Sequence, residues 1–540
     1  MLGPQLLGVV VGGSLSQGLE VRLEDGGVVE ELKVGTFVTI RGERHRFFGM
    51  VTDLGLASAD PRLPSALPDT TNPAIVRILS GTSAYATMQV TPSLVVGGEE
   101  TSLLLEGPQP ARSIPFHFSR AYRASQEDVQ AVFGAEDERH IWIGSPLDME
   151  DTRVCLDLAE FVKRSNGVFG KSGTGKSFLT RILLAGILQR DVAVNLVFDM
   201  HSEYGWEGGS EEGHAVKGLK QLFGSRVAVF SLDEESSRRR GLSPDYLVRI
   251  GYDQIEPQDI ETLAEMLNLT QNAAQATYKL ASRHGQQWLR EFLALEGREE
   301  LAALADQLGE HQQTIESLRR RLDRLNRMAF LVERSPEDSV RRILEYLDRG
   351  THVVLEFGRY GSDLSAYLLV ANLLTRRIHD SYVRRKEQSL GDRAKEPRPL
   401  VITIEEAHRF LNPQVAGLTI FGTIAREMRK YNVTLLVVDQ RPSGIDEEVL
   451  SQVGTRITCL LDNERDIEAV LTGASGAREL RQVLARLEPK QQALIFGHAL
   501  PMPVVVRTRE YGPRTYAEFG FREQAELARE AEKDLKDLFG

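Results

Sequence analysis

The stretch GKSGTGKS at residues 170–177 constrains the fold of this chain more than any other part of its sequence. It fits the pattern G-x-x-x-x-G-K-[ST] at every fixed position, with Gly170, Gly175, Lys176 and Ser177. The apolar run before it predicts a strand, and KSFLTRILLAGILQR after it predicts a helix. A strand, a glycine-rich loop and a helix in this order indicate a phosphate-binding loop within an α/β sheet.

The residue types of this loop suit a nucleotide phosphate. Glycines let backbone N–H groups turn inward around phosphate oxygens, and the helix N-terminus adds unpaired donors and a favourable dipole. We expect the Lys176 ammonium to reach the β- and γ-phosphates of ATP and the Ser177 hydroxyl to ligate Mg²⁺. A glycine-rich turn without a ligand is the alternative interpretation. The predicted nucleotide-binding residues are Gly170, Lys171, Ser172, Gly173, Thr174, Gly175, Lys176, Ser177 and Phe178.

A second candidate site lies in LVITIEE, where a hydrophobic strand runs into the adjacent carboxylates Glu405 and Glu406. A phosphate-binding loop of this kind needs a carboxylate on another strand on the metal side. We expect Glu405 to hold Mg²⁺ through water, and Glu406 to orient and deprotonate the attacking water. The bound cation would offset the repulsion between the two acids. The alternative is an ordinary acidic strand end.

Two further segments carry candidate residues. VTLLVVDQRPSG predicts a strand that ends in Asp439 and Gln440, and the Gln440 amide, which donates and accepts at once, suits a sensor of the γ-phosphate or the attacking water. IAREMRKYN predicts a helix with Arg426, Arg429 and Lys430 on one face. Arg426 is the candidate arginine finger for a neighbouring subunit's ATP. The alternatives are a polar strand end before a turn for Gln440, and a solvated basic face or a DNA contact for the helix.

The pattern of apolar residues divides the chain into segments. The first ~110 residues form short alternating runs broken by glycines, which predict a small barrel or sandwich. Strand and helix patterns then alternate, and a charged helical stretch interrupts them. The predicted domains are a β domain at 1–120, a first part of the α/β core at 121–254, a helical insertion at 255–345, a second part of the core at 346–500, and a C-terminal extension at 501–540.

Composition narrows the class of protein. The net charge of −12 excludes a uniformly basic nucleic-acid binder, but it leaves room for a local basic surface such as the lumen of a ring. The start of the chain lacks the basic segment of a signal peptide, and no apolar run reaches the ~18 residues of a membrane span. The two cysteines, Cys155 and Cys459, lie far apart in sequence, which argues against a disulfide framework. We therefore expect a cytoplasmic protein without a membrane partner.

The ordered set GKSGTGKS, DMHSEYG, ITIEEAHRF, IAREMRKYN and VVDQRPS resembles the HerA helicase/translocase family, close to the FtsK group. The N-terminal β segment looks like the HAS-barrel of that family, so the resemblance covers nearly the whole chain. It implies a RecA-like P-loop NTPase core that uses ATP and Mg²⁺ in a homohexameric ring, with double-stranded DNA in the central pore. It also implies that Glu406 is catalytic, that Gln440 senses and that Arg426 acts in trans. The family often has glycine at the position of Ser202.

The resemblance implies a protein partner but does not choose it. The family acts with the nuclease NurA in DNA end processing, or with a sirtuin-like protein or another nuclease effector in antiviral defence. The alternative to a DNA motor is a ring-forming ATPase that assembles and regulates such an effector. A DEAH-type helicase is excluded, because no second RecA-like lobe fits after residue 510. A P-loop kinase would need an acceptor-binding lid in place of the arginine-bearing helix.

Overall fold

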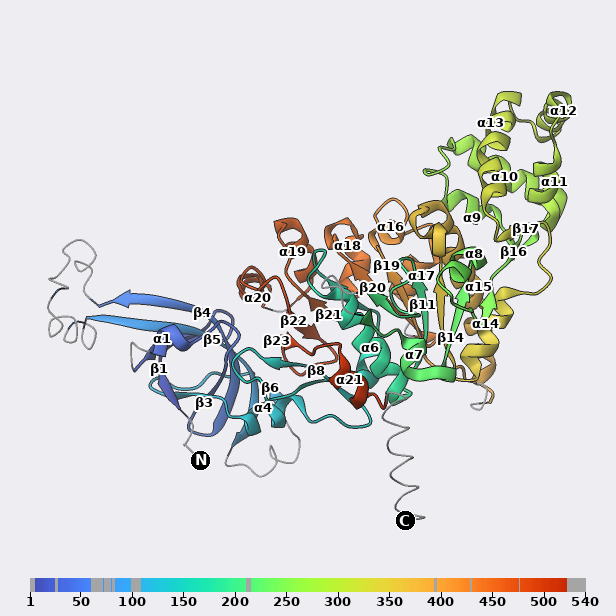
Figure 1. Ribbon diagram of the computed structural model, residues 1–540. Helices are drawn as coiled ribbons and strands as arrows, with labels where there is room; N and C mark the ends of the chain where they lie inside the picture. Colours follow the sequence, from blue (N-terminus) through green and yellow to red (C-terminus); the bar gives the residue numbers. More distant parts are fainter. Residues whose placement is uncertain are drawn as a thin grey trace, which may run out of the picture. The chain divides into compact units, whose positions relative to one another are not determined.

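A computed structural model of the chain divides into two compact units that alternate along the sequence (Figure 1). Unit 1 comprises Met1–Phe161, Val168–Leu179 and Gly454–Arg509, and unit 2 comprises Val162–Gly167, Thr180–Val453 and Glu510–Gly540. The structure describes residues 5–24, 28–59, 71, 79, 83–98, 108–209, 215–392, 396–427, 430–474 and 476–521. The predicted fold class, an α/β P-loop core with an N-terminal β-barrel and a helical insertion, is confirmed.

The N-terminal part of unit 1 is a closed barrel. Its strands follow the order β2-β1-β7-β3-β4-β5, and pairing of β2 with β5 closes the sheet. This pairing decides between the barrel and the sandwich that the sequence left open. The elements are β1 (Leu6–Ser14), β2 (Gly18–Leu23), α1 (Val28–Glu31), β3 (Phe37–Arg41), β4 (His45–Ser58), β5 (Ala84–Gly98), β6 (Gln109–Pro110) and β7 (Arg120–Arg123).

Alternating apolar side chains fill the barrel, including Leu7, Val21, Val38, Val51 and Met88, all buried. Such alternation is what a strand with one face toward a core requires. The strands β1 and β2 approach closely at Gly8. A Cβ at this residue would lie 2.0 Å from the carbonyl oxygen of Arg22, so only glycine fits here.

Outside the barrel, the strands of unit 1 follow the order β10-β21-β22-β23-β8-β9. From β21 to β9 all neighbouring strands are antiparallel. Cys155 and Cys459 are buried in this unit and unpaired. The elements are α4 (Gln126–Phe133), β8 (His140–Pro146), β9 (Val154–Asp157), α5 (Leu158–Phe161), β10 (Asn166–Phe169), β21 (Thr455–Thr458), α19 (Glu464–Leu471), α20 (Ala477–Leu484), β22 (Gln492–Gly497) and β23 (Val504–Thr508).

Unit 2 is built on a parallel sheet with the order β15-β14-β18-β11-β19-β20. Every residue of β14, β18, β11, β19 and β20 is buried, as expected for a parallel sheet covered by helices on both faces. The strands are β11 (Val194–Asp199), β14 (Val227–Ser231), β15 (Tyr246–Leu247), β18 (His352–Glu356), β19 (Leu400–Glu405) and β20 (Val433–Asp439).

Helices and short strands complete the core of unit 2. The helix α6 (Lys176–Arg190) begins in unit 1 and continues into unit 2. No helix within the described ranges is long and apolar enough to span a bilayer. The other elements are β12 (Gly208–Gly209), β13 (Ala215–Val216), α7 (Leu219–Phe223), α8 (Glu234–Arg239), β16 (Ile250–Gly251), β17 (Leu331–Val332), α14 (Ser339–Asp348), α15 (Leu364–Ser389), α16 (His408–Leu411), α17 (Ile420–Glu427), α18 (Glu447–Ser451) and α21 (Pro513–Glu518).

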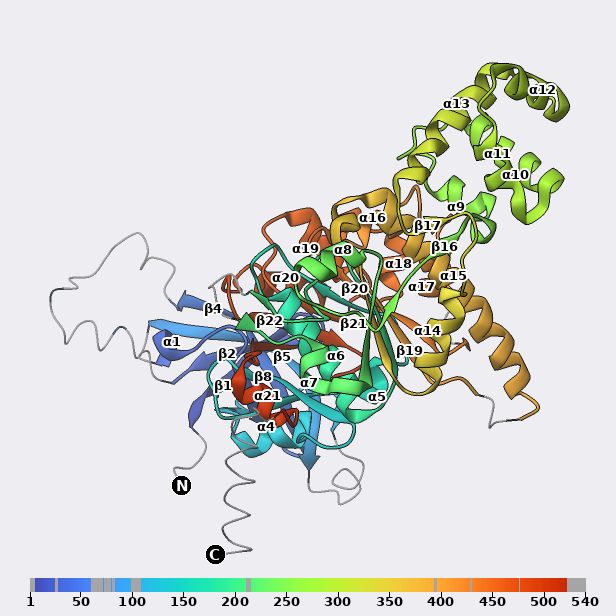
Figure 2. The same cartoon turned by 45° about the vertical axis from the view of Figure 1, so that its right-hand side comes forward.

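A group of helices extends from the parallel sheet of unit 2, with α12 and α13 in its outer part (Figure 2). Its own small core contains Leu280, Trp288, Phe292, Ile315 and Leu318, all buried. We call it the helical group; it consists of α9 (Pro257–Thr262), α10 (Gln271–His284), α11 (Trp288–Ala294), α12 (Arg298–Leu308), α13 (Gln312–Leu322) and the 3₁₀ helix η4 (Asp323–Arg327).

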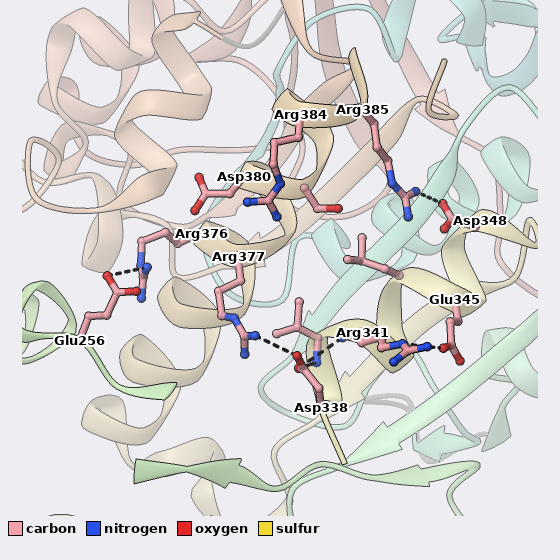
Figure 3. A pocket seen from close by; sticks show the side chains of 13 residues that line it. Glu256, Asp338, Arg341, Glu345, Asp348, Arg376, Arg377, Asp380, Arg384 and Arg385 are labelled. Carbon is pink, nitrogen blue, oxygen red and sulfur yellow. Dashed lines mark hydrogen bonds and ion pairs between the residues drawn. The ribbon is translucent and has the colours of Figure 1, made fainter. Parts of the chain in front are cut away.

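Two consecutive arginines of α15 pair with acids that precede and follow the core of the helical group in the sequence (Figure 3). Arg376 pairs with Glu256 at 2.8 Å and with Asp259 at 2.9 Å, where the chain enters the group. Arg377 pairs with Asp338 at 2.9 Å, where the chain returns to the sheet. The pairs of Arg376 with Glu256 and of Arg377 with Asp338 line an open groove of about 460 Å³ between α14 and α15. Its five arginines face five carboxylates, so the groove carries no net charge and we interpret it as an anchoring network.

Candidate active site

The glycine-rich loop lies between β10 and α6, and its backbone has the conformation that only glycine adopts readily. Gly170, Gly173 and Gly175 have φ values of 151°, 77° and 96°. A Cβ at residue 170 would lie 2.8 Å from the Cβ of Cys459 and from Oγ1 of Thr174. A Cβ at residue 175 would meet nothing within 4 Å, so the space beside this residue is open. The loop therefore fits a phosphate group.

Hydrogen bonds and an ion pair between residues of unit 1 stabilise the shape of the loop. Lys176 Nζ and Thr174 Oγ1 both donate to the carbonyl oxygen of Lys171, each at 2.8 Å. The Lys171 ammonium instead pairs with Asp462 at 2.8 Å, on the segment after β21. The Lys176 ammonium thus lies over the loop, where a phosphate would bind, while Lys171 is held at the periphery. All the predicted nucleotide-binding residues lie in this loop or in the first turn of α6.

Four buried carboxylates end four adjacent strands of the parallel sheet in unit 2. Glu356 ends β18, Asp199 ends β11, Glu405 ends β19 and Asp439 ends β20. The register pairs Asp199 with Glu356, so these side chains lie at one edge of the sheet. The carboxyl end of a parallel sheet is where α/β proteins bind their ligands.

The Glu405 carboxylate is buried with one oxygen unsatisfied. Tyr204 donates its hydroxyl to Oε1 of Glu405 at 2.8 Å, and Oε2 has no hydrogen-bond partner within the described part of the chain. Burial, together with the charges of Glu203 and Asp199, raises the pKa of Glu405 to about 8. A cation would relieve this excess of negative charge, so Glu405 fits the predicted metal-side role.

The neighbouring Glu406 is half-buried, and its hydrogen-bond partner differs from that of Glu405. Its φ of 50° places it in the left-handed region, so the chain turns sharply after β19. Gln440 Nε2 donates to Oε1 of Glu406 at 2.9 Å, and His408 Nε2 lies 3.7 Å from Oε2. The structure therefore brings together the predicted base and the predicted sensor, from the ends of β19 and β20.

His408 and Asp439 support Glu406, and no role for this pair was predicted from the sequence. Asp439 accepts a hydrogen bond from the backbone N–H of His408 at 2.6 Å, and its carboxylate contacts Nδ1 at 3.0 Å. Its other oxygen accepts from the backbone N–H of Arg441 at 2.6 Å. The imidazole is thereby fixed with Nε2 toward Glu406. The only sequence signal was the histidine two residues after Glu406, in EEAH.

The loop after β11 presents Tyr204 to Glu405. Asp199 accepts hydrogen bonds from the backbone N–H groups of Glu203 and Tyr204, each at 2.8 Å, and of Gly205 at 3.2 Å. Burial nevertheless raises the pKa of Asp199. Ser202 has a φ of 57°, so the left-handed conformation favoured by glycine is kept here by a serine. The tyrosine was missed because only the folded loop shows where its hydroxyl lies.

Arg426 lies in the last turn of α17, and its Nε is 3.8 Å from an oxygen of Glu448 on α18. Among the described residues, the Arg426 side chain forms no hydrogen bond or ion pair with Glu405, Glu406 or Gln440. The shared helical face of Arg426, Arg429 and Lys430 stays a prediction, because residues 428 and 429 between α17 and Lys430 lie outside the described ranges. Arg429 lies outside the residues that the structure describes.

In the part of the chain that the structure describes, Glu405 is the candidate metal ligand. Within the described ranges, no cluster of three or more His, Cys, Asp or Glu side chains is arranged as a metal site. Mg²⁺ in nucleotide enzymes is typically held by one or two protein oxygens together with phosphate oxygens and water. The single unsatisfied oxygen of Glu405 matches that pattern.

Comparisons with known proteins match both parts of this architecture. The family model described as the central domain of helicase HerA matches residues 141–378, and the model of the HAS barrel domain matches residues 7–70. The DNA double-strand break repair helicase HerA of Pyrococcus furiosus is 26% identical over 459 residues, covering 76% of each chain. The protein of the same name from Sulfurisphaera tokodaii is 23% identical over 528 residues, covering 94% of this chain and 93% of its own.

Solved structures give weaker similarities. VirB4 of Thermoanaerobacter pseudethanolicus is 15% identical with a TM-score of 0.46, covering 71% of this chain and 99% of its own. The plasmid coupling protein TrwB, in complex with ADP and Mg²⁺, is 14% identical with a TM-score of 0.46, covering 73% of this chain and 95% of its own.

The HAS-barrel model matches the barrel, and the HerA model matches the later segment that contains the glycine-rich loop. The relatives align with most of the chain. The segments that these matches cover carry the loop with Lys176 as well as the barrel strands. The chain is therefore similar to the HerA helicases over most of its length, and it is a P-loop ATPase.

Proposed function

We propose that this chain is an ATP-driven DNA translocase and helicase that works as a homohexameric ring, with duplex DNA in the central pore. The observation that carries the proposal is the contact between Glu406 and Gln440 at the carboxyl edge of a parallel sheet, in a chain that also has an open glycine-rich loop. The names of the relatives, DNA double-strand break repair helicases, supply the substrate class.

In this proposal the loop residues 170–178 hold the phosphates of ATP. The Lys176 ammonium would leave the carbonyl oxygen of Lys171 and pair with the β- and γ-phosphates. Ser177 and Glu405 would hold Mg²⁺, which neutralises phosphate charge when bound. The unsatisfied Oε2 of Glu405 supports this assignment.

Glu406 would act as the general base for the attacking water. A carboxylate on a strand edge can accept a proton while a hydrogen bond keeps it in place, and Gln440 supplies that bond at 2.9 Å. The same amide can donate to the γ-phosphate when ATP is present, which suits a sensor. Glu406 and Gln440 therefore form one unit, and loss of either should lower turnover more than nucleotide binding.

Arg426 would complete the ATP site of a neighbouring subunit. Its ion pair with Glu448 is long, at 3.8 Å, and partly exposed. Such surface pairs contribute only about 0–1 kcal/mol, so the guanidinium can leave Glu448 for a phosphate at little cost. Hydrolysis would then remove the bridge between subunits and allow them to shift along DNA.

The proposed partner is a nuclease in DNA end processing, such as NurA, in line with the repair role in the relatives' names. The second candidate is a ring ATPase that assembles and regulates an antiviral defence effector, such as a nuclease or a sirtuin-like protein. The two candidates differ in one measurable property. A motor hydrolyses ATP faster on duplex DNA, whereas a regulatory ring need not.

The test compares Glu406→Gln with the exposed control Glu448→Gln in nucleotide binding and in DNA-stimulated ATPase. Glu406→Gln should bind ATP as the wild type does and lose turnover, and Glu448→Gln should keep both. Loss of ATP binding in Glu406→Gln would reassign that residue to nucleotide binding. Wild-type turnover that ignores duplex DNA would overturn the motor and favour the regulatory ring.

A further inference from the structure

Four arginines follow each other along one edge of the helical group. The segment RRRLDRLNR at 319–327 contains five arginines and one aspartate, in a chain whose net charge is −12. Arg319 is turned inward, where it donates to the carbonyl oxygens of Leu293 at 2.7 Å and Leu295 at 3.1 Å. The other four remain on the surface, and we call them the arginine edge: Arg320, Arg321, Arg324 and Arg327.

Among the residues that the structure describes, no member of the arginine edge forms an ion pair with a carboxylate. Arg324 donates to the carbonyl oxygen of Met266 at 3.3 Å, which leaves its charge uncompensated. The one acid of the segment, Asp323, is already held by Arg319 at 3.1 Å, and this hydrogen bond is the main reason that its pKa is lowered.

Some other exposed arginines of unit 2 are paired. Arg290 lies 3.5 Å from Glu333, Arg298 lies 3.3 Å from Glu316, and Arg341 lies 3.3 Å from Glu345. These three arginines therefore provide paired counterparts for the arginine edge, whose members have no carboxylate partner among the described residues.

The arrangement of the arginine edge is unfavourable for the chain alone. Arg320 and Arg324 are four residues apart and Arg324 and Arg327 are three apart, so their side chains are neighbours on the helix surface. Like charges at these spacings destabilise a helix. The negative end of the dipole of α13 favours cations in its last turn, but it acts over only one turn and cannot compensate four charges. An anionic partner would remove this repulsion.

We propose that the arginine edge binds the phosphate backbone of the DNA on which the ring acts. This inference rests on the proposed function, and it assigns a DNA contact to the helical group. Arginine suits the task because its guanidinium forms paired hydrogen bonds with phosphate oxygens. From residue 320 to residue 327 the edge extends about 10–12 Å along the helix, the rise of roughly three phosphates of one strand. Contacts of this kind carry no sequence preference.

The test measures how the affinity for a long duplex of arbitrary sequence depends on salt. Each neutralised phosphate adds about 0.9 to the slope of log affinity against log salt concentration. The variant Arg320→Gln/Arg324→Gln/Arg327→Gln should therefore have a slope smaller than that of the wild type by about 2.7. Its ATPase without DNA should be unchanged, which also reports on folding.

The matched control removes three paired arginines of the same unit, in the variant Arg290→Gln/Arg298→Gln/Arg341→Gln. It changes the net charge by the same amount, and its slope should stay within about 0.5 of the wild type. Equal slopes for the wild type and the arginine-edge variant, or equal losses in both variants, would overturn the inference while leaving the proposed function intact. A wild-type chain that does not bind duplex DNA at all would overturn both.

Discussion

Replacement of Arg376 by methionine should loosen the helical group from the parallel sheet. The Arg376 side chain is 11% exposed, and its partner Asp259 is 0% exposed. Asp259 also accepts from the backbone N–H of Glu256 at 2.9 Å, and its Oδ1 has no partner within the described residues. Burial already raises the pKa of Asp259, even beside the guanidinium. Without Arg376 the carboxylate would be a buried charge with no cation near it.

The expected cost follows from the burial of this pair. Removal of one partner of a buried ion pair costs about 3–5 kcal/mol, because the other charge remains desolvated. The adjacent Arg377 offers a matched control, since Arg377 and Asp338 are 28% and 37% exposed. Surface pairs of that kind contribute only about 0–1 kcal/mol. Methionine retains much of the apolar stem in both variants, so the difference reports the charge.

Hydrogen exchange of peptides from α10 to α13 measures this effect directly, because it reports local opening of the helical group. At about 1.4 kcal/mol per factor of ten, Arg376→Met should accelerate exchange there by roughly two to three and a half orders of magnitude, and Arg377→Met by less than tenfold. The double variant Arg376→Met/Asp259→Asn should recover part of the protection, since no buried charge remains. Equal exchange in the two single variants would refute the reasoning.

Three further variants probe the ATP site. Gly175→Ala should lose nucleotide binding, because a φ of 96° strains any side chain, and fluorescent-nucleotide titration measures the loss; unchanged affinity would contradict this role. Gln440→Glu places a second carboxylate beside Glu406 and should lower kcat at least tenfold with unchanged ATP affinity, whereas loss of affinity would assign Gln440 to binding. Arg426→Ala should be inactive alone but regain ATPase when mixed with Lys176→Ala subunits, and absence of rescue would exclude a trans role.

The local parts of the site could be predicted from the sequence because their signals are local. The loop at 170–177 has glycines at the positions where φ is positive, and Glu405 and Glu406 end a continuous apolar strand. Gln440 was expected to follow a strand, and its contact with Glu406 arises because β19 and β20 are paired. The domain boundaries at 120, 254, 345 and 500 stay predictions.

Contacts between distant segments could not be predicted in the same way. Tyr204 reaches Glu405 only because Asp199 binds three consecutive backbone N–H groups and turns the loop back toward β19. At Ser202 the residue type argued against the left-handed conformation, yet the same hydrogen bonds to Asp199 stabilise it. Residue preference sets a cost of about 1 kcal/mol there, and tertiary hydrogen bonds can exceed it.

The four carboxylates at the sheet edge differ in their partners, and this difference supports Glu405 as the proposed metal ligand. Glu356 has the guanidinium of Arg240, Asp199 has three backbone N–H groups, and Asp439 has the imidazole and backbone of His408. The only side-chain partner of Glu405 within the described residues is the neutral hydroxyl of Tyr204. Because a buried carboxylate with few hydrogen-bond partners is unstable, we propose that Glu405, which accepts this one bond, is the member of this row that a bound cation stabilises most.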